Sequence, residues 1–133
     1  MSNKNIIPAV IFVLILLMSC DSNNSDVNNK SNNKYFVEYA GGYTIEIIGY
    51  SSNDEAELYV LHLNGKAKWM LISNDRSGKA KIMSEKSGSW TADEGRMKIT
   101  IQGNTGPIVE EYLLKNGKFV NTISEDRYLQ RTR

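Results

Sequence analysis

Apolar and polar residues alternate along the chain from Tyr35 onward, and turn-forming residues interrupt the alternation about every 8–12 positions. The run 97–102 is the clearest case, because its odd-numbered residues are apolar and its even-numbered residues are polar. Residues 43–47 alternate in the same way, and residues 58–63 are almost continuously apolar. No segment of eleven residues carries a helical period. The pattern therefore predicts an all-β domain made of antiparallel strands.

Two Asn-Gly pairs, Asn64-Gly65 and Asn116-Gly117, separate apolar runs. Both residue types accept the positive φ angles of a type I′ turn, so we expect a tight hairpin at each pair. Weaker turns are expected at residues 51–54, 74–78, 87–88, 93–95 and 103–107. Seven to nine strands joined by short loops favour an up-and-down barrel or meander, which residues 128–131 can close. Residues 35–39 fit either a short helix or a leading strand.

The first twenty residues have a different pattern. Lys4 precedes ten consecutive apolar residues, Ala9 to Met18. As a helix this run spans roughly 15 Å, about half of a bilayer's hydrocarbon core. A short apolar run behind a positive residue is typical of a signal peptide and less so of a spanning helix.

The residues that end this run, Leu17-Met18-Ser19-Cys20, resemble a bacterial lipobox. The resemblance implies cleavage after Ser19, a diacylglycerol thioether on Cys20 and acylation of the new amino terminus. Met18 departs from the usual pattern, which has a smaller residue there. The alternative is an uncleaved anchor with an incidental cysteine.

Residues 21–34 contain Asn, Ser, Asp and Lys with Val27 as the only apolar residue. Such a segment cannot bury enough surface to order itself, so we expect a flexible tether of about 20 Å. The expected organisation is a signal peptide at 1–19, a lipidated Cys20 with its tether at 20–34, and a β-barrel domain at 35–133. The resulting location is the bacterial cell envelope, with the lipid in the outer membrane and either face of that membrane possible.

Charge and composition exclude several functions. The 133 residues contain 16 basic and 15 acidic side chains, a net charge of +1. Removal of Lys4 with the signal peptide leaves 15 of each, so the mature chain has no electrostatic attraction for nucleic acid. One Cys and one His cannot form a zinc site or an intrachain disulfide. No cofactor or metal is expected.

Short motifs in the domain resemble those of small bacterial lipocalin-like and NlpE-type lipoproteins of a Bacteroidetes-like kind. They are Gly42-Tyr43-Thr44, the segment GSWTADEGRMKITI at 88–101, the hairpin EEYLLKNGKFVN at 110–121 and the closing RYLQRTR. The Cys-x-x-Cys motif of the NlpE type is absent. The resemblance implies a barrel that either holds a ligand or packs solid, and it implies no enzymatic activity.

Residues that could support catalysis are sparse. His62 lies in an apolar strand with no nucleophile beside it, which favours a structural role. Acidic pairs at 54–55, 93–94 and 125–126 lie in predicted turns, where solvated acids are ordinary. Glu110 and Glu111 are adjacent on a strand, so they face opposite sides and cannot form a dyad. The protein is therefore not expected to be an enzyme.

Aromatic side chains are the best candidates for a binding site, because aromatics that point into a barrel can stack on flat or apolar ligands. Packing of the core is the alternative use of the same residues. Arg127 and Arg131 are expected on a solvated face. The predicted function is a lipid-anchored, non-catalytic binding module for a small apolar ligand or an envelope protein, and a structural or inhibitory lipoprotein is the alternative. The candidate ligand-binding residues are Trp69, Trp90, Tyr43, Tyr59 and Tyr112.

Overall fold

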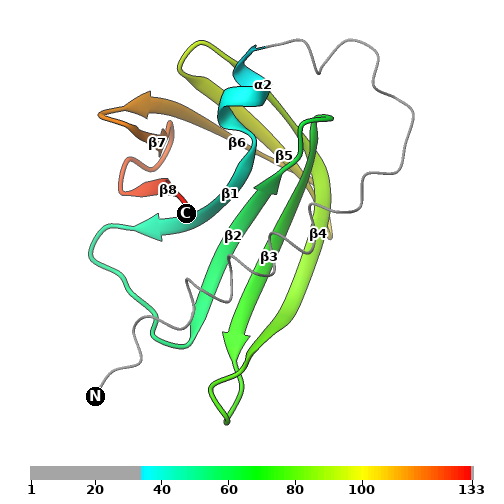
Figure 1. Ribbon diagram of the computed structural model, residues 1–133, viewed down its shortest axis with the longest axis vertical. Helices are drawn as coiled ribbons and strands as arrows, with labels where there is room; N and C mark the ends of the chain where they lie inside the picture. Colours follow the sequence, from blue (N-terminus) through cyan, green and yellow to red (C-terminus); the bar gives the residue numbers. More distant parts are fainter. Residues whose placement is uncertain (1–33, 133) are drawn as a thin grey trace.

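The computed structural model describes residues 34–132 (Figure 1). The predicted signal peptide, Cys20 and the tether up to residue 33 lie outside the described residues. One short helix precedes eight strands in the described part of the chain. The elements are α2 (Lys34–Tyr39), β1 (Gly41–Ile47), β2 (Glu55–Leu61), β3 (Lys66–Asn74), β4 (Ala80–Asp93), β5 (Arg96–Gly103), β6 (Gly106–Lys115), β7 (Lys118–Asn121) and β8 (Arg127–Arg131).

Each strand pairs antiparallel with the next, and β8 pairs with β1 to close the barrel. This confirms the predicted all-β, up-and-down fold. Gly65 has a φ of 81° in the turn between β2 and β3, and Asn116 and Gly117 have φ values of 51° and 78° between β6 and β7. Both Asn-Gly hairpins therefore form where the sequence places them. The two left-handed residues of a type I′ turn occur at Asn116-Gly117, whereas Gly65 but not Asn64 has a positive φ, so the turn type predicted at Asn64-Gly65 is wrong.

The turn predicted at residues 87–88 is wrong, because β4 runs through it without a break. Gly88 pairs with Ile101 of β5. A Cβ atom on Gly88 would lie 1.9 Å from the carbonyl oxygen of Thr100. The glycine therefore permits close approach of two backbones and does not reverse the chain. Residues 35–39, left open between helix and strand, are helical, and this helix begins at Lys34.

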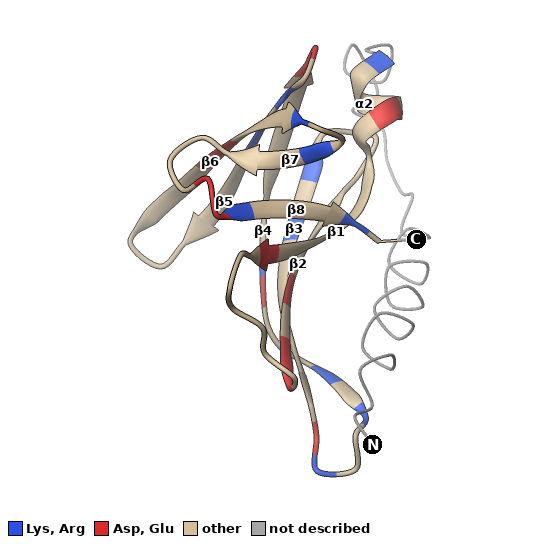
Figure 2. Ribbon diagram, turned by 90° about the vertical axis from the view of Figure 1, so that its left-hand side faces the viewer, with Lys and Arg blue, Asp and Glu red and all other residues tan. Residues whose placement is uncertain are grey.

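The helix α2 closes one end of the barrel. The ring of Phe36 lies 4.4 Å from that of Trp90, and the ring of Tyr39 lies 4.9 Å from that of Phe119. Trp90 also donates a hydrogen bond of 2.8 Å to the carbonyl oxygen of His62. Figure 2 shows α2 at one end and the long β3–β4 hairpin reaching past the other. We call the end opposite α2 the open end.

Strand pairing stops on two sides of the open end. β1 pairs with β2 only over residues 41–44 and then continues along β8. β6 pairs with β7 only over residues 112–115, although β6 begins at Gly106. The short strands β7 and β8 with the second half of β1 thus form one wall, and β2 to β6 form the other. Contacts between side chains must hold the two walls together where the backbone pairing ends.

Candidate functional site

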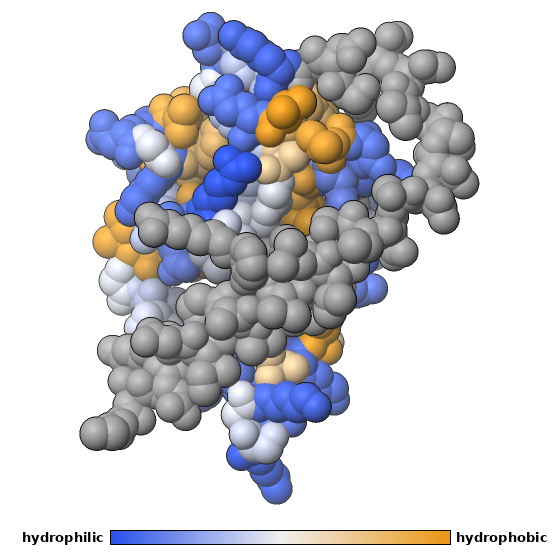
Figure 3. All heavy atoms as spheres, in the orientation of Figure 1, coloured by the Kyte–Doolittle hydropathy of each residue, from blue (hydrophilic) through white to orange (hydrophobic). Residues whose placement is uncertain are grey.

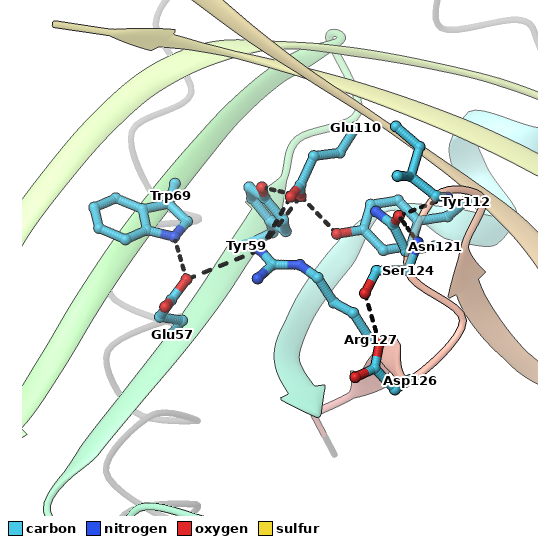
Figure 4. Close-up of polar contacts among 10 residues, drawn as sticks. Glu57, Tyr59, Trp69, Glu110, Tyr112, Asn121, Ser124, Asp126 and Arg127 are labelled. Carbon is cyan, nitrogen blue, oxygen red and sulfur yellow. Dashed lines mark hydrogen bonds and ion pairs between the residues drawn. The ribbon is translucent and has the colours of Figure 1, made fainter. Parts of the chain in front are cut away.

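A carboxylate of β6 gathers three polar groups inside the open end. Glu110 pairs with Ile99, whose side chain lies in the core, so alternation directs Glu110 inward as well. Its Oε2 accepts hydrogen bonds of 2.6 Å from the hydroxyl of Tyr59 and 2.6 Å from that of Tyr112 (Figure 4). Its Oε1 lies 3.1 Å from Nη2 of Arg127.

A second carboxylate extends this network toward solvent. Glu57, on the same face of β2 as Tyr59, accepts a hydrogen bond of 3.1 Å from the indole N–H of Trp69. Its Oε2 also lies 4.0 Å from Nη2 of Arg127. The ammonium group of Lys86 lies 5.3 Å from the centre of the Trp69 ring, a cation–π contact. We call the following six residues the Arg127 cluster: Glu57, Tyr59, Trp69, Glu110, Tyr112 and Arg127.

The position of Arg127 explains why the cluster forms here. Arg127 begins β8, in the short wall, whereas both of its carboxylate partners belong to the long wall. Its side chain reaches across the region where β1 leaves β2 and β6 leaves β7 (Figure 4). Arg127 is thus an ionic link between the two walls, and it does this without backbone pairing.

The cluster is accessible from solvent at one side. The side chains of Glu110 and Arg127 are 19% and 22% exposed, and that of Glu57 is 42% exposed. Two carboxylates and one guanidinium lie together, with Lys86 as the neighbouring cation on Trp69. The Nε atom of Arg127 is buried and has no hydrogen-bond partner among the described residues. The open end therefore offers a charged surface, and the unpartnered Nε donor lies buried beneath it.

Burial fixes the protonation of the two tyrosines. Loss of solvent and the adjacent Glu110 carboxylate both raise the pKa of Tyr59 and of Tyr112 well above the ordinary value of 10.0. Burial opposes the charge of Arg127, but its contacts with Tyr112 and Glu110 more than compensate and raise its pKa. Both phenols are thus proton donors and the guanidinium is a permanent cation.

The predicted ligand-binding residues fall into two groups. Trp69, Tyr59 and Tyr112 meet in the Arg127 cluster, with Trp69 only partly buried. Trp90 and Tyr43 lie in the core nearer α2, where both are buried. The structure therefore joins three of the five through carboxylates, and it places the other two among packed side chains.

The prediction of a solvated arginine face is wrong for Arg127, because β8 turns this residue into the barrel. Arg131 also has specific partners, since its guanidinium donates to the carbonyl oxygens of Glu38 and Ala40 at 2.9 and 2.8 Å. Glu57 and Glu110 are absent from the predicted binding residues. A signal for them exists in the alternation, because each shares the inward register with a buried tyrosine two residues away.

Other candidate chemistry remains isolated. His62 is half-buried, and burial together with Lys68 and Lys66 lowers its pKa. Glu111 faces away from Glu110 and lies 4.0 Å from Lys98. Among residues 34–132, no group of three His, Cys, Asp or Glu side chains is placed to hold a metal ion. No helix in that same range is long and apolar enough to cross a membrane.

Apolar side chains surround the polar cluster at the rim. Ile47 and Ile108, both on inward registers, are exposed, and so are Ile48 and Tyr50 in the loop that follows β1. On the side shown in Figure 3, apolar surface occurs in patches between hydrophilic side chains. The open end thus combines exposed apolar side chains at its rim with the charged Arg127 cluster further inside.

Comparison with known proteins gives no match to a family model, to a curated protein or to a solved structure. The Arg127 cluster and the fold are therefore the basis for any functional conclusion.

Proposed function

We propose that this chain is a lipid-anchored protein of the bacterial cell envelope and a non-catalytic binding module, whose site is the open end of the barrel. The supporting sequence features are the apolar run at 9–18, the lipobox-like Leu17–Cys20 and the polar segment that follows. Lipid on Cys20 would hold the barrel at a membrane, and the polar segment would space it from the surface.

The observation that carries the binding proposal is the partly exposed Arg127 cluster in a barrel that is otherwise filled. The closed end leaves no room for an apolar ligand among described side chains that are at most 3% exposed, such as Phe36, Tyr43 and Trp90. The open end instead favours an amphipathic ligand. Its apolar part would lie against Trp69 and the isoleucine rim, and its polar group would contact Arg127 or Glu57.

A hydrolytic activity fits this geometry less well. Glu110 already accepts from two phenols and lies against a guanidinium, so its lone pairs are engaged and it is a poor general base. Glu57 has no nucleophile among its described contacts. The ion pairs and hydrogen bonds of Glu57, Glu110 and Arg127 are instead suited to stabilising the barrel at its open end, because each charge has a partner.

Tryptophan fluorescence tests the proposal, since the two indoles lie at different depths. The probe is 8-anilinonaphthalene-1-sulfonate, an amphipathic anion, titrated into a Trp90→Phe variant that reports only Trp69. We expect saturable quenching, and an Arg127→Gln variant should weaken binding by about tenfold, equivalent to about 1.4 kcal/mol. Lys98→Gln, on the exterior of β5, is the matched control and should leave the titration unchanged.

A Trp69→Phe variant that reports only Trp90 should respond weakly, because Trp90 lies under α2. Quenching that is equal for both indoles, or that persists in Arg127→Gln, would contradict a site at the open end. A chain that binds no probe but retains one stoichiometric envelope protein would support the alternative, a structural or inhibitory lipoprotein.

A further inference from the structure

Two loops at the open end carry exposed apolar side chains. One loop follows β1, and the other connects β7 to β8. Ile48 and Tyr50 in the first loop are 68% and 67% exposed, and Ile123 in the second loop is 90% exposed. Single exposed apolar residues are ordinary on a protein surface, but a group of them on adjoining loops is typical of an interaction site.

The two loops lie against each other, so these side chains belong to one surface. The backbone N–H of Ile48 donates a hydrogen bond of 2.8 Å to the carbonyl oxygen of Asp126 (Figure 1). The buried side chain of Asn121 accepts hydrogen bonds from the N–H groups of Ile123 and Ser124 at 2.9 and 3.0 Å. Hydrogen bonds thus order both loops while their apolar side chains face solvent. An ordered surface loses little conformational entropy when it binds a partner.

The same loops, with the strand ends that border them, are acidic. Residues 46–55 and 121–126 contain five carboxylates and no lysine or arginine. Lys115 neutralises one of them, Glu125, at 2.9 Å. The other four form no ion pair of 4.0 Å or less with any residue that the structure describes, and they are Glu46, Asp54, Glu55 and Asp126 (Figure 2). We call these four carboxylates together with Ile48, Tyr50 and Ile123 the loop surface.

We propose that the loop surface binds a segment of another protein that carries both apolar and basic side chains. Protein interfaces combine apolar contact with polar and charged groups at the rim. Lysine or arginine of the partner would compensate the four carboxylates, which have no compensating charge among the described residues. The inference goes beyond the proposed function, because it assigns the outward loops and requires no small ligand at the Arg127 cluster.

Other occupants fit the loop surface less well. An anionic lipid bilayer would be repelled by the carboxylates. A second copy of the chain that used the same surface would bring carboxylates against carboxylates, and like charges across an interface are unfavourable. Small molecules prefer concave pockets, whereas Ile48, Tyr50 and Ile123 are too exposed to line one.

Peptide binding to the full chain tests the proposal. The chain is carried in phosphatidylcholine nanodiscs, and the signal from empty nanodiscs is subtracted. The probe is a fluorescein-labelled amphipathic helix of leucine and lysine, whose fluorescence anisotropy should rise saturably. A peptide with serine in place of leucine, or with glutamate in place of lysine, should bind about tenfold more weakly or worse, because each lacks one of the two required properties.

Paired substitutions locate the apolar contact. Ile48→Ser combined with Ile123→Ser should weaken binding of the lysine peptide by about tenfold, because both positions lose apolar burial in the complex. Val37→Ser combined with Leu63→Ser is the matched control. These two side chains are 63% and 54% exposed near the closed end, so their replacement should leave the affinity unchanged.

A second pair of substitutions tests the charges. Asp54→Asn combined with Asp126→Asn should weaken binding by about threefold, and the affinity should then fall less steeply as salt is raised. The variants should keep the circular dichroism spectrum of the parent, because the replaced side chains are exposed. Arg127→Gln should leave the peptide affinity within about twofold, since Arg127 points into the barrel. Failure of this proposal is therefore distinguishable from failure of the proposed function.

Absence of saturable binding, or equal binding of the lysine and glutamate peptides, would overturn the proposal. An affinity that Ile48→Ser with Ile123→Ser leaves unchanged would overturn it also. Quenching of Tyr50→Trp by brominated phosphatidylglycerol, beyond the quenching of the parent, would overturn it by assigning the loops to the bilayer. A covalent dimer formed by Ile123→Cys but not by Val37→Cys would overturn it by assigning the loop surface to a second copy of the chain.

Discussion

Gly88 lies within β4 at a point where the backbone of β5 leaves no space for a side chain. A Cβ atom there would meet the carbonyl oxygen of Thr100 at 1.9 Å, and backbone cannot yield as a flexible side chain can. Gly88→Ala should therefore lower the free energy of unfolding by about 1–3 kcal/mol, the usual cost of overpacking. Urea unfolding of the parent and of Gly88→Ala measures this change in the free energy of unfolding.

Ser89→Ala is the control for this change, because Ser89 is the next residue and is exposed. Its effect should stay within about 0.5 kcal/mol. A Gly88→Ala protein as stable as the parent would mean that β4 and β5 can separate at this point at little cost.

His62 links stability to pH. Burial and the nearby Lys68 and Lys66 lower its pKa in the folded protein below 6.5. The unfolded chain then binds the proton more readily, so stability is lost as the pH falls below 6.5 toward the folded-state pKa. We expect the parent protein to lose more stability than His62→Gln between about pH 7.5 and pH 5.

The difference between these two proteins isolates His62 from the carboxylates that titrate in the same experiment. Urea unfolding at several pH values is the measurement. Stability curves that stay parallel would show that His62 has the same pKa in both states.

At the scale of elements, the short helix α2 supplies side chains that fill the closed end of the barrel. Phe36 is buried and packs on Trp90 with the ring centres 4.4 Å apart. Phe36→Ala should lower the free energy of unfolding by about 3–5 kcal/mol through the lost burial and the cavity left behind. It should also increase the exposure of Trp90, seen as a red shift of its fluorescence in Trp69→Phe.

Val37→Ala is the matched control, since Val37 is on the same helix and is 63% exposed. Its effect should be within about 0.5 kcal/mol. Equal effects at both positions would contradict a closing role for Phe36 and would indicate that α2 as a whole is loosely attached.

The elements that the sequence predicts well are those with local causes. The turn at Asn64-Gly65 depends on its own backbone preference, and the strand at 97–102 on its own alternation. The helix α2 has six residues, too few to be stable alone. Arg131, more than ninety positions away, donates hydrogen bonds to carbonyl groups at its carboxyl end. No pattern within 35–39 could contain that information.

The site shows the same division. Alternation alone directs Glu110 inward beside Tyr112, and this much could have been read from the strand at 108–114. The ion-pair partner of Glu110 could not have been predicted in this way, because Arg127 approaches through the closure of β8 on β1. Arginines near the end of a chain are ordinarily solvated, and only the barrel's geometry makes this one an internal ion pair.

At the scale of the whole molecule, the proposed lipid anchor determines where the barrel works. Cys20→Ser should move the protein from the detergent phase to the aqueous phase in detergent phase separation, because several acyl chains at about 0.8 kcal/mol per methylene make attachment effectively permanent. The barrel should keep its circular dichroism spectrum. Ser25→Ala, in the polar segment that follows the lipobox-like residues, is the control for a general effect of substitution.

Partitioning that Cys20→Ser leaves unchanged would contradict lipidation and favour the uncleaved anchor. Mass spectrometry of the parent protein gives an independent result, since a lipidated amino terminus begins at Cys20 and an uncleaved one at Met1.

The closure of β1 on β8 has a consequence for how the chain can be cut and rejoined. Every other strand pair of the barrel is between sequence neighbours, whereas the hydroxyl of Thr44 donates to the carbonyl oxygen of Gln130 across 86 positions. Closing that long loop costs entropy that the hairpins do not, so we expect the seam to form late in folding. The two ends of the barrel meet there, since the backbone N–H of Thr132 donates to the carbonyl oxygen of Gly42. A circular permutant that joins these ends and opens the chain at Asn116-Gly117 would make the seam local and would leave β6–β7 as the one pairing between distant residues. We therefore expect the β6–β7 pairing, in place of the β1–β8 pairing, to form late in this permutant, without a change of architecture.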